Sequence, residues 1–151
     1  IVKLREKRNR RYAGLLKEGV PILDGVKETL SLLLGKVIMG VVTGSRREHF
    51  EIIHQHSGLL PYFDLVLTRE DYRRSKPDPD PYLTAIKTYG IEREHCLVVE
   101  DSERGLLAAR AAGIRCIVVP NPLTKKGDFS GAYRVFQTIR EVGEEVLNLF
   151  S

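Results

Sequence analysis

The sequence predicts an α/β fold in which a parallel, doubly wound sheet is covered by helices on both faces. Short apolar runs with few charged side chains alternate along the chain with longer stretches that carry helical end signals. Apolar runs of this kind indicate strands that are buried on both faces of a sheet. Repeated alternation of strand and helix favours parallel βαβ units, which place helices on each side of one sheet.

Four apolar runs are the expected strands, and they cover residues 36–43, 63–68, 96–100 and 114–119. Pro120 and Pro122 interrupt the chain after the last run. Gly, Pro, Asn and Lys are frequent from there on, so we expect residues 120–135 to form an irregular loop.

Helices are expected between these runs, and capping residues mark their ends. A side-chain oxygen at the start of a helix can accept a hydrogen bond from a free N–H group of the first turn. The candidate caps are Asp24, the box Ser45–Glu48, Asp80 before Pro81, Ser102, and the box Thr138–Glu141. The candidate stops are Gly35, Gly58, Gly90 and Gly113.

Composition indicates which classes of protein the chain can belong to. With 151 residues, of which 42% are hydrophobic, the chain is long enough for one domain with a single core. No apolar run approaches the roughly 18 residues that a membrane span needs, and no signal peptide opens the sequence. Cys96 and Cys116 lie in apolar runs, so we expect two buried thiols in a cytoplasmic protein and not a disulfide.

The net charge of +4 comes from the N-terminal segment. Residues 1–18 carry seven Lys or Arg and two Glu, whereas acids slightly outnumber bases in the rest of the chain. A solvated face of one helix accounts for such a run, so we expect no nucleic-acid partner. The chain starts at Ile1 and its only methionine is Met39, so we also expect a further segment upstream.

Thr43, Gly44 and Ser45 follow the first apolar run. In a doubly wound sheet, ligands bind beyond the carboxyl ends of the strands, so this is where chemistry is expected. A hydroxyl together with free N–H groups at a helix N-terminus can bind an anion. The structural alternative is that Thr43 only ends a strand and that Ser45 only caps a helix.

Charged side chains follow the next two runs. Lys76 lies after the second run, and an ammonium group on a flexible stem can neutralise a phosphate; the alternative is a solvated loop lysine. Glu100 and Asp101 follow the third run, and Mg²⁺ binds such carboxylates together with water and phosphate; the alternative is that Asp101 and Ser102 cap the next helix. Together these groups predict a phosphate cradle beside a metal site, as phosphoryl transfer requires.

Three segments carry a resemblance to the haloacid dehalogenase superfamily. V-V-T-G-S at 41–45, S-K-P-D-P-D-P-Y at 75–82 and C-L-V-V-E-D-S-E-R-G-L-L-A-A-R-A-A-G-I at 96–114 resemble its motifs II, III and IV. The sequence looks closest to the β-phosphoglucomutase-like group of phosphatases and sugar-phosphate mutases. The resemblance runs from about Gly19 to the C-terminus, and its third segment is the most specific.

The resemblance implies a phosphate site and a Rossmann-like core. Thr43 would hydrogen-bond the transferring phosphoryl group, with the amides of Gly44 and Ser45 nearby. Lys76 would neutralise that group and the nucleophile.

It also implies a metal and a division of the chain. Asp101 would ligate Mg²⁺, and Glu100 would ligate it directly or through water. Residues 1–18 look like the last helix of a mobile cap, and residues 19–151 look like the core domain without its first strand.

The family's first motif, D-x-D-G-T, has no counterpart in the sequence. By the resemblance it would supply the aspartate nucleophile, a second aspartate as general acid and base, and a carbonyl ligand for Mg²⁺. Asp24 opens a helix with no second Asp two residues earlier, and Asp78 and Asp80 lie among prolines and not at a strand end. We therefore expect the chain by itself to be inactive or nearly so.

In this family the missing motif lies on a central strand, between the strands that end at Thr43 and Glu100. Its loss would leave two strands with unpaired backbone edges. Either another segment, from upstream or from a second chain, fills the position, or the two strands close up against each other.

Other functions fit the sequence less well. A phosphoacceptor receiver domain also combines a hydroxyl, a Lys-Pro and an acidic pair, but there the acidic pair comes first in the chain. His49, His54 and His56 share a helix but not one face, so no zinc site is expected. A non-catalytic module that binds phosphate or Mg²⁺ is the main alternative to an enzyme.

The expected function is Mg²⁺-dependent phosphoryl transfer on a small phosphorylated metabolite, through an aspartyl-phosphate in the complete protein. Phosphatase and sugar-phosphate mutase both stay open, because the cap that would select the substrate is almost entirely absent from the sequence.

Overall fold

The computed structural model describes residues 2–150 and, within the first helix, the side chains of Glu6 and residues 11–17. The helices are α1 (Val2–Lys17), α2 (Val26–Leu33), α3 (Arg47–His54), α4 (Asp80–Tyr89), α5 (Glu103–Ala111) and α6 (Ile139–Phe150). The strands are β1 (Gly40–Val42), β2 (Leu65–Leu67), β3 (Leu97–Glu100), β4 (Arg115–Val118) and β5 (Arg134–Val135). Three 3-10 turns, η1 (Leu60–Tyr62), η2 (Arg69–Asp71) and η3 (Arg93–His95), lie between them.

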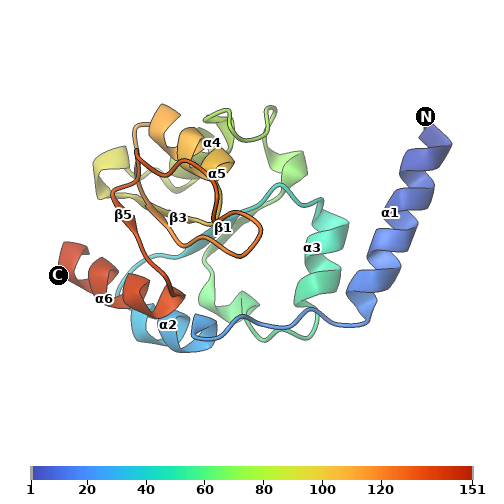
Figure 1. Cartoon of the computed structure of the whole chain (residues 1–151), viewed down its shortest axis with the longest axis horizontal. Coiled ribbons are helices and arrows are strands. Elements are labelled where there is room, and N and C mark those ends of the chain that lie inside the picture. The colour runs from blue at the N-terminus through green and yellow to red at the C-terminus, as the bar shows by residue number, and fades with distance from the viewer. Residues whose placement is uncertain (1, 151) are drawn as a thin grey trace.

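All pairings among these strands are parallel, and they join β1 to β2, β3 to β4 and β4 to β5. Val41 lies opposite Val66 in the first pair, and Val98 lies opposite Cys116 in the second. Helices separate the first four strands along the chain, whereas β5 follows β4 without a helix between them (Figure 1). The predicted parallel α/β class is therefore confirmed.

Helices cover both faces of the sheet, as expected for a doubly wound fold. Cys116 and Val118 of β4 pack on one side, in a cluster with Leu106 of α5. Ile117, between them, packs on the other side in a cluster with Val142 of α6. This alternation is the two-residue period of a strand. In Figure 1, α4 and α5 lie above the strands, and α2 and α6 lie below them.

The sheet is divided where the family resemblance predicts a central strand. Within residues 2–150, β1 pairs with β2 only and β3 with β4 only, so the strands form two separate sheets. Ile38 and Val99 flank the division and are 59% and 42% exposed, although both belong to runs that were expected to be buried. The two strands therefore do not close up against each other.

Two cavities occupy the space between β1 and β3, which we call the strand gap. The larger has a volume of about 610 Å³ and lies toward α2 and α6, and the smaller has a volume of about 190 Å³ and lies toward α4. Gly40, Leu97 and Val99 line both cavities. The gap thus runs between the two layers of helices, at the level of the sheet.

The strand expected at residues 36–43 is reduced to Gly40–Val42. A strand is held by hydrogen bonds to its neighbours, and β1 has a neighbour on one side only. The other three expected strands appear at Leu65–Leu67, Leu97–Glu100 and Arg115–Val118.

Several predicted helix ends are confirmed. The hydroxyl of Ser102 accepts a hydrogen bond from the N–H group of Gly105 at 3.2 Å, at the start of α5. Gly90 and Gly113 follow α4 and α5 with φ of 65° and 73°, in the left-handed region that ends helices. At the start of α6, the carboxylate of Glu141 accepts the N–H of Thr138 at 2.9 Å, which is one half of the predicted box.

The predicted cap at Asp24 is wrong. Gly25 is the N-cap of α2, with a φ of 84° that turns the backbone away from a helical start. The carboxylate of Asp24 instead lies 2.9 Å from the guanidinium of Arg140.

The predicted capping box at Ser45 and Glu48 is also wrong. The N–H of Ser45 donates to the hydroxyl of Thr43 at 3.1 Å, which closes a turn there. The helix begins at Arg47, one residue later than this box predicts, with Arg46 as its N-cap and without a side-chain cap bond among the described residues. Asp80 is likewise the first residue of α4 and not its cap.

Two features carried no clear signal in the sequence. β5 lies within the segment expected to be an irregular loop, and it adds a third strand beside β4. A capping box joins Thr68 and Asp71 around η2. Both elements are short, so neither contains enough residues for a periodic pattern.

α1 covers nearly all of the segment 1–18 and packs against α3. The ring of Tyr12 lies 5.0 Å from that of His49, edge to face, and Leu16 is buried. Arg11 and Lys17, two members of the expected solvated basic face, are exposed. Its other members, Lys3, Arg5, Lys7, Arg8 and Arg10, have side chains that lie outside the described residues.

Cys96 and Cys116 are free thiols, as predicted. Cys116 is buried and Cys96 is half-buried. In the described part of the chain, no helix combines the length and the apolarity that crossing a membrane requires.

We expect Ser102→Ala to lower the free energy of unfolding by about 1 kcal/mol, because it removes the acceptor for the Gly105 N–H. Ser45→Ala is the matched control, and it should change stability by less than about 0.5 kcal/mol. Urea denaturation followed by circular dichroism measures both variants. Equal losses would mean that Ser45 caps α3 after all.

Candidate functional site

Thr43, at the end of β1, lies in a turn that the neighbouring strand holds in place. Its N–H donates to the carbonyl of Leu67 at 2.9 Å, and its carbonyl accepts the hydroxyl of Tyr72 at 3.0 Å. Its side-chain hydroxyl accepts the N–H of Ser45 at 3.1 Å. The segment 43–45 is therefore fixed both to β2 and within itself.

The η2 turn is hydrogen-bonded to this segment. Arg69 donates its N–H to the carbonyl of Ser45 at 2.9 Å. Asp71 accepts the N–H of the buried Thr68 at 2.7 Å and pairs with the guanidinium of Arg47. The backbone hydrogen bond from Thr68 is the main cause that lowers the pKa of Asp71, so its carboxylate is ionised at neutral pH.

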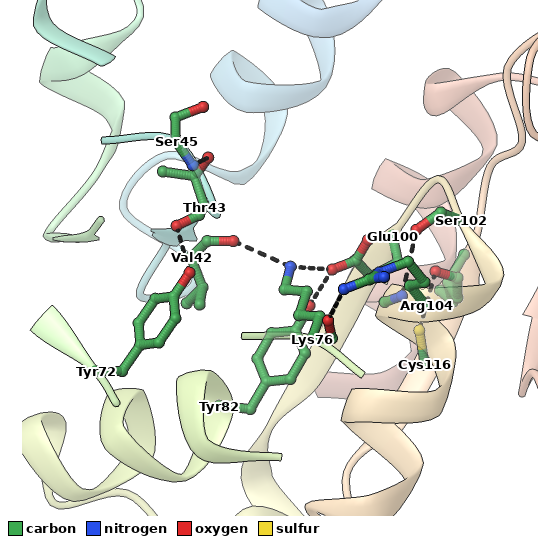
Figure 2. A network of polar contacts seen from close by, with 12 residues as sticks. Val42, Thr43, Ser45, Tyr72, Lys76, Tyr82, Glu100, Ser102, Arg104 and Cys116 are labelled. Atoms are coloured by element: carbon green, nitrogen blue, oxygen red, sulfur yellow. Dashed lines mark hydrogen bonds and ion pairs between the residues drawn. The ribbon is translucent and has the colours of Figure 1, made fainter. Parts of the chain in front are cut away.

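The ammonium of Lys76 lies between the ends of β1 and β3 (Figure 2). Its ammonium donates to the carbonyl of Val42 at 3.1 Å and to Oε1 of Glu100. The ammonium also lies 4.8 Å from the ring centre of Tyr82. The side chains of Lys76 and Glu100 are only 19% and 9% exposed, so the pair is largely shielded from water.

The loop before α4 is organised around Lys76. The carboxylate of Asp80 accepts the N–H groups of Arg73 and Arg74 at 2.6 and 2.8 Å. Arg104, from α5, donates to the carbonyl of Lys76. These bonds fix the backbone on both sides of the lysine, so its side chain enters the site from a defined position.

Glu100 is enclosed at the end of β3. Its Oε1 accepts from Lys76 and from the hydroxyl of Tyr82. A Cβ atom placed on Gly105 would lie 1.9 Å from the carboxyl carbon of Glu100, so only glycine leaves room for this carboxylate at that position of α5.

Two other groups beside Glu100 stay protonated at neutral pH. Burial, and then the charge of Glu100, raise the pKa of the Tyr82 hydroxyl well above its ordinary value. Burial, and then Glu100, also raise the pKa of Cys116 to about 12, while Lys76 acts in the opposite direction. Tyr82 is therefore a hydrogen-bond donor here, and Cys116 is an unreactive thiol.

Asp101, the residue after Glu100, is exposed. Its carboxylate accepts the side-chain amide N–H of Asn121 at 3.0 Å. The amide oxygen of Asn121 in turn accepts the N–H groups of Leu123 and Thr124 at 2.8 and 3.1 Å. Since the oxygen is engaged by the backbone, the amide nitrogen of Asn121 is turned toward Asp101.

The structure thus brings most of the predicted site residues to one edge of the sheet. Lys76 and Glu100 are in direct contact, and Thr43 follows the residue whose carbonyl Lys76 binds. Gly44 and Ser45 continue the same turn, with the Ser45 N–H directed to Thr43. Asp101 adjoins Glu100 in sequence, but no described contact joins it to Lys76.

Three residues of the site were not anticipated. Tyr72, Tyr82 and Asn121 hold Thr43, Glu100 and Asp101, respectively, through their side chains. Tyr82 closes the S-K-P-D-P-D-P-Y segment, and its place in the first turn of a helix after Lys76 was the one available signal.

Glu100 and Asp101 are carboxylates of the type that binds Mg²⁺, although they do not surround a cation by themselves. Mg²⁺ usually binds one or two protein carboxylates and completes its shell with water and phosphate. Glu100 and Asp101 are adjacent, and Asp101 is open to solvent. Among the residues that the structure describes, no group of three or more His, Cys, Asp or Glu side chains is placed to hold a metal.

The rejected nucleophile candidates have structural contacts instead. Asp24 pairs with Arg140, and Asp80 binds the backbone of the loop before α4. Asp78 accepts the N–H of Asp80 at 3.0 Å. None of these described contacts joins them to Lys76.

Comparison with known proteins places the chain among hydrolases. The family model for haloacid dehalogenase-like hydrolases matches residues 2–119. Validoxylamine A 7'-phosphate phosphatase from Streptomyces hygroscopicus subsp. limoneus is 38% identical over 96 residues, which are 63% of this chain and 45% of that protein. Protein CbbY from Rhodobacter capsulatus is 30% identical over 137 residues, which are 87% of this chain and 60% of that protein.

Solved structures show the same fold. CbbY from Rhodobacter sphaeroides in complex with phosphate superposes with a TM-score of 0.80 at 26% identity, over 94% of this chain and 65% of that one. β-Phosphoglucomutase from Clostridium difficile gives a TM-score of 0.83 at 21% identity, over 99% and 66% of the two chains. The chain spans only part of each relative, but the family match covers most of its own length. The chain belongs to the haloacid dehalogenase-like hydrolase family.

Proposed function

We propose that the complete protein transfers the phosphoryl group of a small phosphate monoester, and that this chain supplies the phosphate and metal sites. The observation that carries the proposal is the position of Lys76. A shielded ammonium at the meeting point of two strand ends, next to the Thr43 turn, is suited to an anion that arrives at the carboxyl edge of the sheet.

In this proposal Thr43, Gly44, Ser45 and Lys76 bind the phosphate. The hydroxyl of Thr43 donates to a phosphate oxygen, and the amides of Gly44 and Ser45 lie close to it. Lys76 neutralises charge that develops on the phosphoryl oxygens, for which it is already desolvated. The anchoring of the turn by Leu67 and Tyr72 supports these roles, because a fixed donor loses little freedom on binding.

Asp101 and Glu100 are the proposed Mg²⁺ ligands. Mg²⁺ would supply charge neutralisation to the phosphate oxygens. The exposed carboxylate of Asp101 would bind the cation directly. Glu100 has one oxygen, Oε2, outside the bonds to Lys76 and Tyr82, and this oxygen would face the cation or one of its waters.

The substrate would be a phosphorylated small molecule. The related phosphatases include one for validoxylamine A 7'-phosphate and one for fructose 1-phosphate, and a related CbbY structure holds xylulose-(1,5)bisphosphate. A phosphatase and a sugar-phosphate mutase are both consistent with the site of this chain. A cytoplasmic location, with substrate drawn from soluble metabolites, belongs to the same proposal.

We further propose that residues 1–18 are the last helix of a cap and that residues 19–151 are the core. The contacts of α1 support this division, since α1 packs on α3 and lies to one side of the sheet (Figure 1). α3 begins at Arg47, shortly after Thr43, so a cap that contained α1 would lie near the site.

The strand gap supports the proposal that a further strand completes the protein. β1 and β3 each present an unpaired edge to the gap within the described residues. Val42 of β1 and Glu100 of β3 both reach Lys76, so the two strands end at the same edge and run in the same direction. A single extended segment parallel to both would pair with both edges and would end beside Lys76.

Such a segment would bring the nucleophile that the chain lacks. In the family's D-x-D-G-T motif, the first aspartate would attack phosphorus as the ester P–O bond breaks. The second aspartate would give a proton to the departing alcohol, and water would then hydrolyse the aspartyl-phosphate. The segment would come from the same polypeptide upstream or from a second chain.

The alternative is a non-catalytic module that binds phosphate or Mg²⁺. It is favoured by one observation: within residues 2–150, no carboxylate other than Glu100 contacts Lys76. A site without an aspartate in that place can bind an anion but cannot form an aspartyl-phosphate.

The first test is Mg²⁺-dependent hydrolysis of an aryl phosphate by the chain, alone and with a synthetic strand peptide that carries D-x-D-G-T. We expect the chain alone to give no turnover above its Asp101→Asn variant. Addition of the peptide should produce turnover, and a peptide with Asn in place of the first Asp should not.

Each other outcome has a definite meaning. Turnover by the chain alone that Asp101→Asn abolishes would show that the nucleophile lies within residues 1–151. A peptide that binds, as followed by NMR, but gives no turnover would support the non-catalytic module.

A second test addresses the metal. Mn²⁺ binding, followed by water proton relaxation and displaced with Mg²⁺, should weaken at least about tenfold in Asp101→Asn. Asp24→Asn is the matched control, because Asp24 is also an exposed aspartate but pairs with Arg140. Equal affinities in the wild type and Asp101→Asn would remove Asp101 from the metal site.

A further inference from the structure

Tyr82 donates its hydroxyl to the same oxygen of Glu100 that accepts from Lys76 (Figure 2). Tyr82 belongs to the first turn of α4, whereas Glu100 ends β3. The bond therefore joins a helix on one face of the sheet to the edge where the site lies. It is the only described bond of the Tyr82 hydroxyl.

The ring of Tyr82 also contacts Lys76. The ammonium lies 4.8 Å from the ring centre, which is within the range of a cation–π interaction. Tyr82 itself is 5% exposed. One side chain thus touches both members of the ion pair, the acid through its hydroxyl and the base through its ring.

The other side of Glu100 is closed by α5. The backbone of Gly105 approaches so closely that a Cβ atom there would overlap the carboxylate. With Gly105 on one side and with Lys76 and Tyr82 bound to Oε1, the carboxyl group has one orientation in this enclosure. Oε2 takes part in none of the described hydrogen bonds, although it is the oxygen that lies nearer to Gly105.

Packing alone does not account for a tyrosine at this position. Phenylalanine would fill the same volume in the cluster that contains Val98, Leu106 and Cys116, and it would keep the ring under the ammonium. A buried hydroxyl without a hydrogen-bond partner is destabilising, and here its described partner is Glu100.

We propose that Tyr82 is a positioning residue. Its hydrogen bond holds Oε1 of Glu100 at Lys76, so that only Oε2 remains to face the bound cation. The inference rests on the proposed metal role of Glu100, which it deepens by assigning one oxygen to each task. Tyr82 also helps to position Lys76, because the ammonium of Lys76 lies between Glu100, the Val42 carbonyl and the Tyr82 ring.

The test compares Tyr82→Phe with Tyr62→Phe in the whole chain. Tyr62 is a matched control, since its hydroxyl is also bonded to one side chain, Ser31, at 2.9 Å and lies outside the site. The first readout needs no metal: the ¹³C resonance of the Glu100 carboxyl group, assigned as the signal that is lost in Glu100→Gln. We expect Tyr82→Phe to shift this resonance toward those of solvated glutamates, and Tyr62→Phe to leave it in place.

The second readout is Mn²⁺ affinity. Loss of an outer-shell hydrogen bond typically weakens metal binding by 10- to 100-fold, and we expect about tenfold for Tyr82→Phe and no change for Tyr62→Phe. An unchanged carboxyl resonance in a folded Tyr82→Phe protein would overturn the proposal, because the ring alone would then suffice. A shifted resonance with unchanged Mn²⁺ affinity would also overturn it, since the orientation of Glu100 would not matter to the cation.

Failure of the proposed metal site would be seen separately. In that case the wild type would bind Mn²⁺ no better than Asp101→Asn, while the metal-free resonance would still report on Tyr82 and Glu100. If Tyr82→Phe does not fold, the reciprocal variant decides: Glu100→Gln should shift the ¹³Cζ resonance of Tyr82, and no shift there would contradict the contact.

Discussion

The ammonium of Lys76 joins the two halves of a divided sheet. It binds a backbone carbonyl of β1 and the carboxylate that ends β3, in a place where the strands themselves exchange no hydrogen bonds. A shielded charge is costly unless it is paired, so each partner depends on the other for its position. The bonds of Asp80 and Arg104 to the loop of Lys76 keep the lysine at this junction. The arrangement of the site therefore depends on one lysine ammonium held between two strand ends.

The division of the sheet explains several otherwise separate features. β1 has a neighbour on one side only and is short, whereas β4, with strands on both sides, has Ile117 and Val118 fully buried. Ile38 and Val99 are exposed at the gap, although their runs are as apolar as those of buried strands. Local sequence thus specifies strands of one kind, and the presence or absence of a neighbour decides how far their side chains are buried.

The sequence sufficed for the fold class and for the groups at the strand ends, because both are local. Apolar runs and alternation predict a parallel sheet, Thr43 and Glu100 end two such runs, and Lys76 lies in the loop after another. The contacts of Tyr82 and Asn121 join segments about twenty residues apart, and no local pattern indicates which polar atom a side chain will meet. The predictions that Asp24 and Ser45 cap helices were wrong for a related reason. Each residue fits the capping rule, but Arg140 and Thr43 provide competing partners.

The bonds that hold Thr43 and Asp101 lie within each half of the sheet, whereas the bonds of Lys76 cross the gap. Thr43 is fixed by Leu67 and Tyr72, on the side of β1 and β2, and Asp101 is fixed by Asn121, which follows β4. A strand that entered the gap would meet these anchors already formed, and it would end beside Lys76. The Thr43 turn and the carboxylate pair are therefore ordered in the described chain without a strand in the gap. Under the proposed function, that strand would add the nucleophile to a site whose other groups already hold their positions.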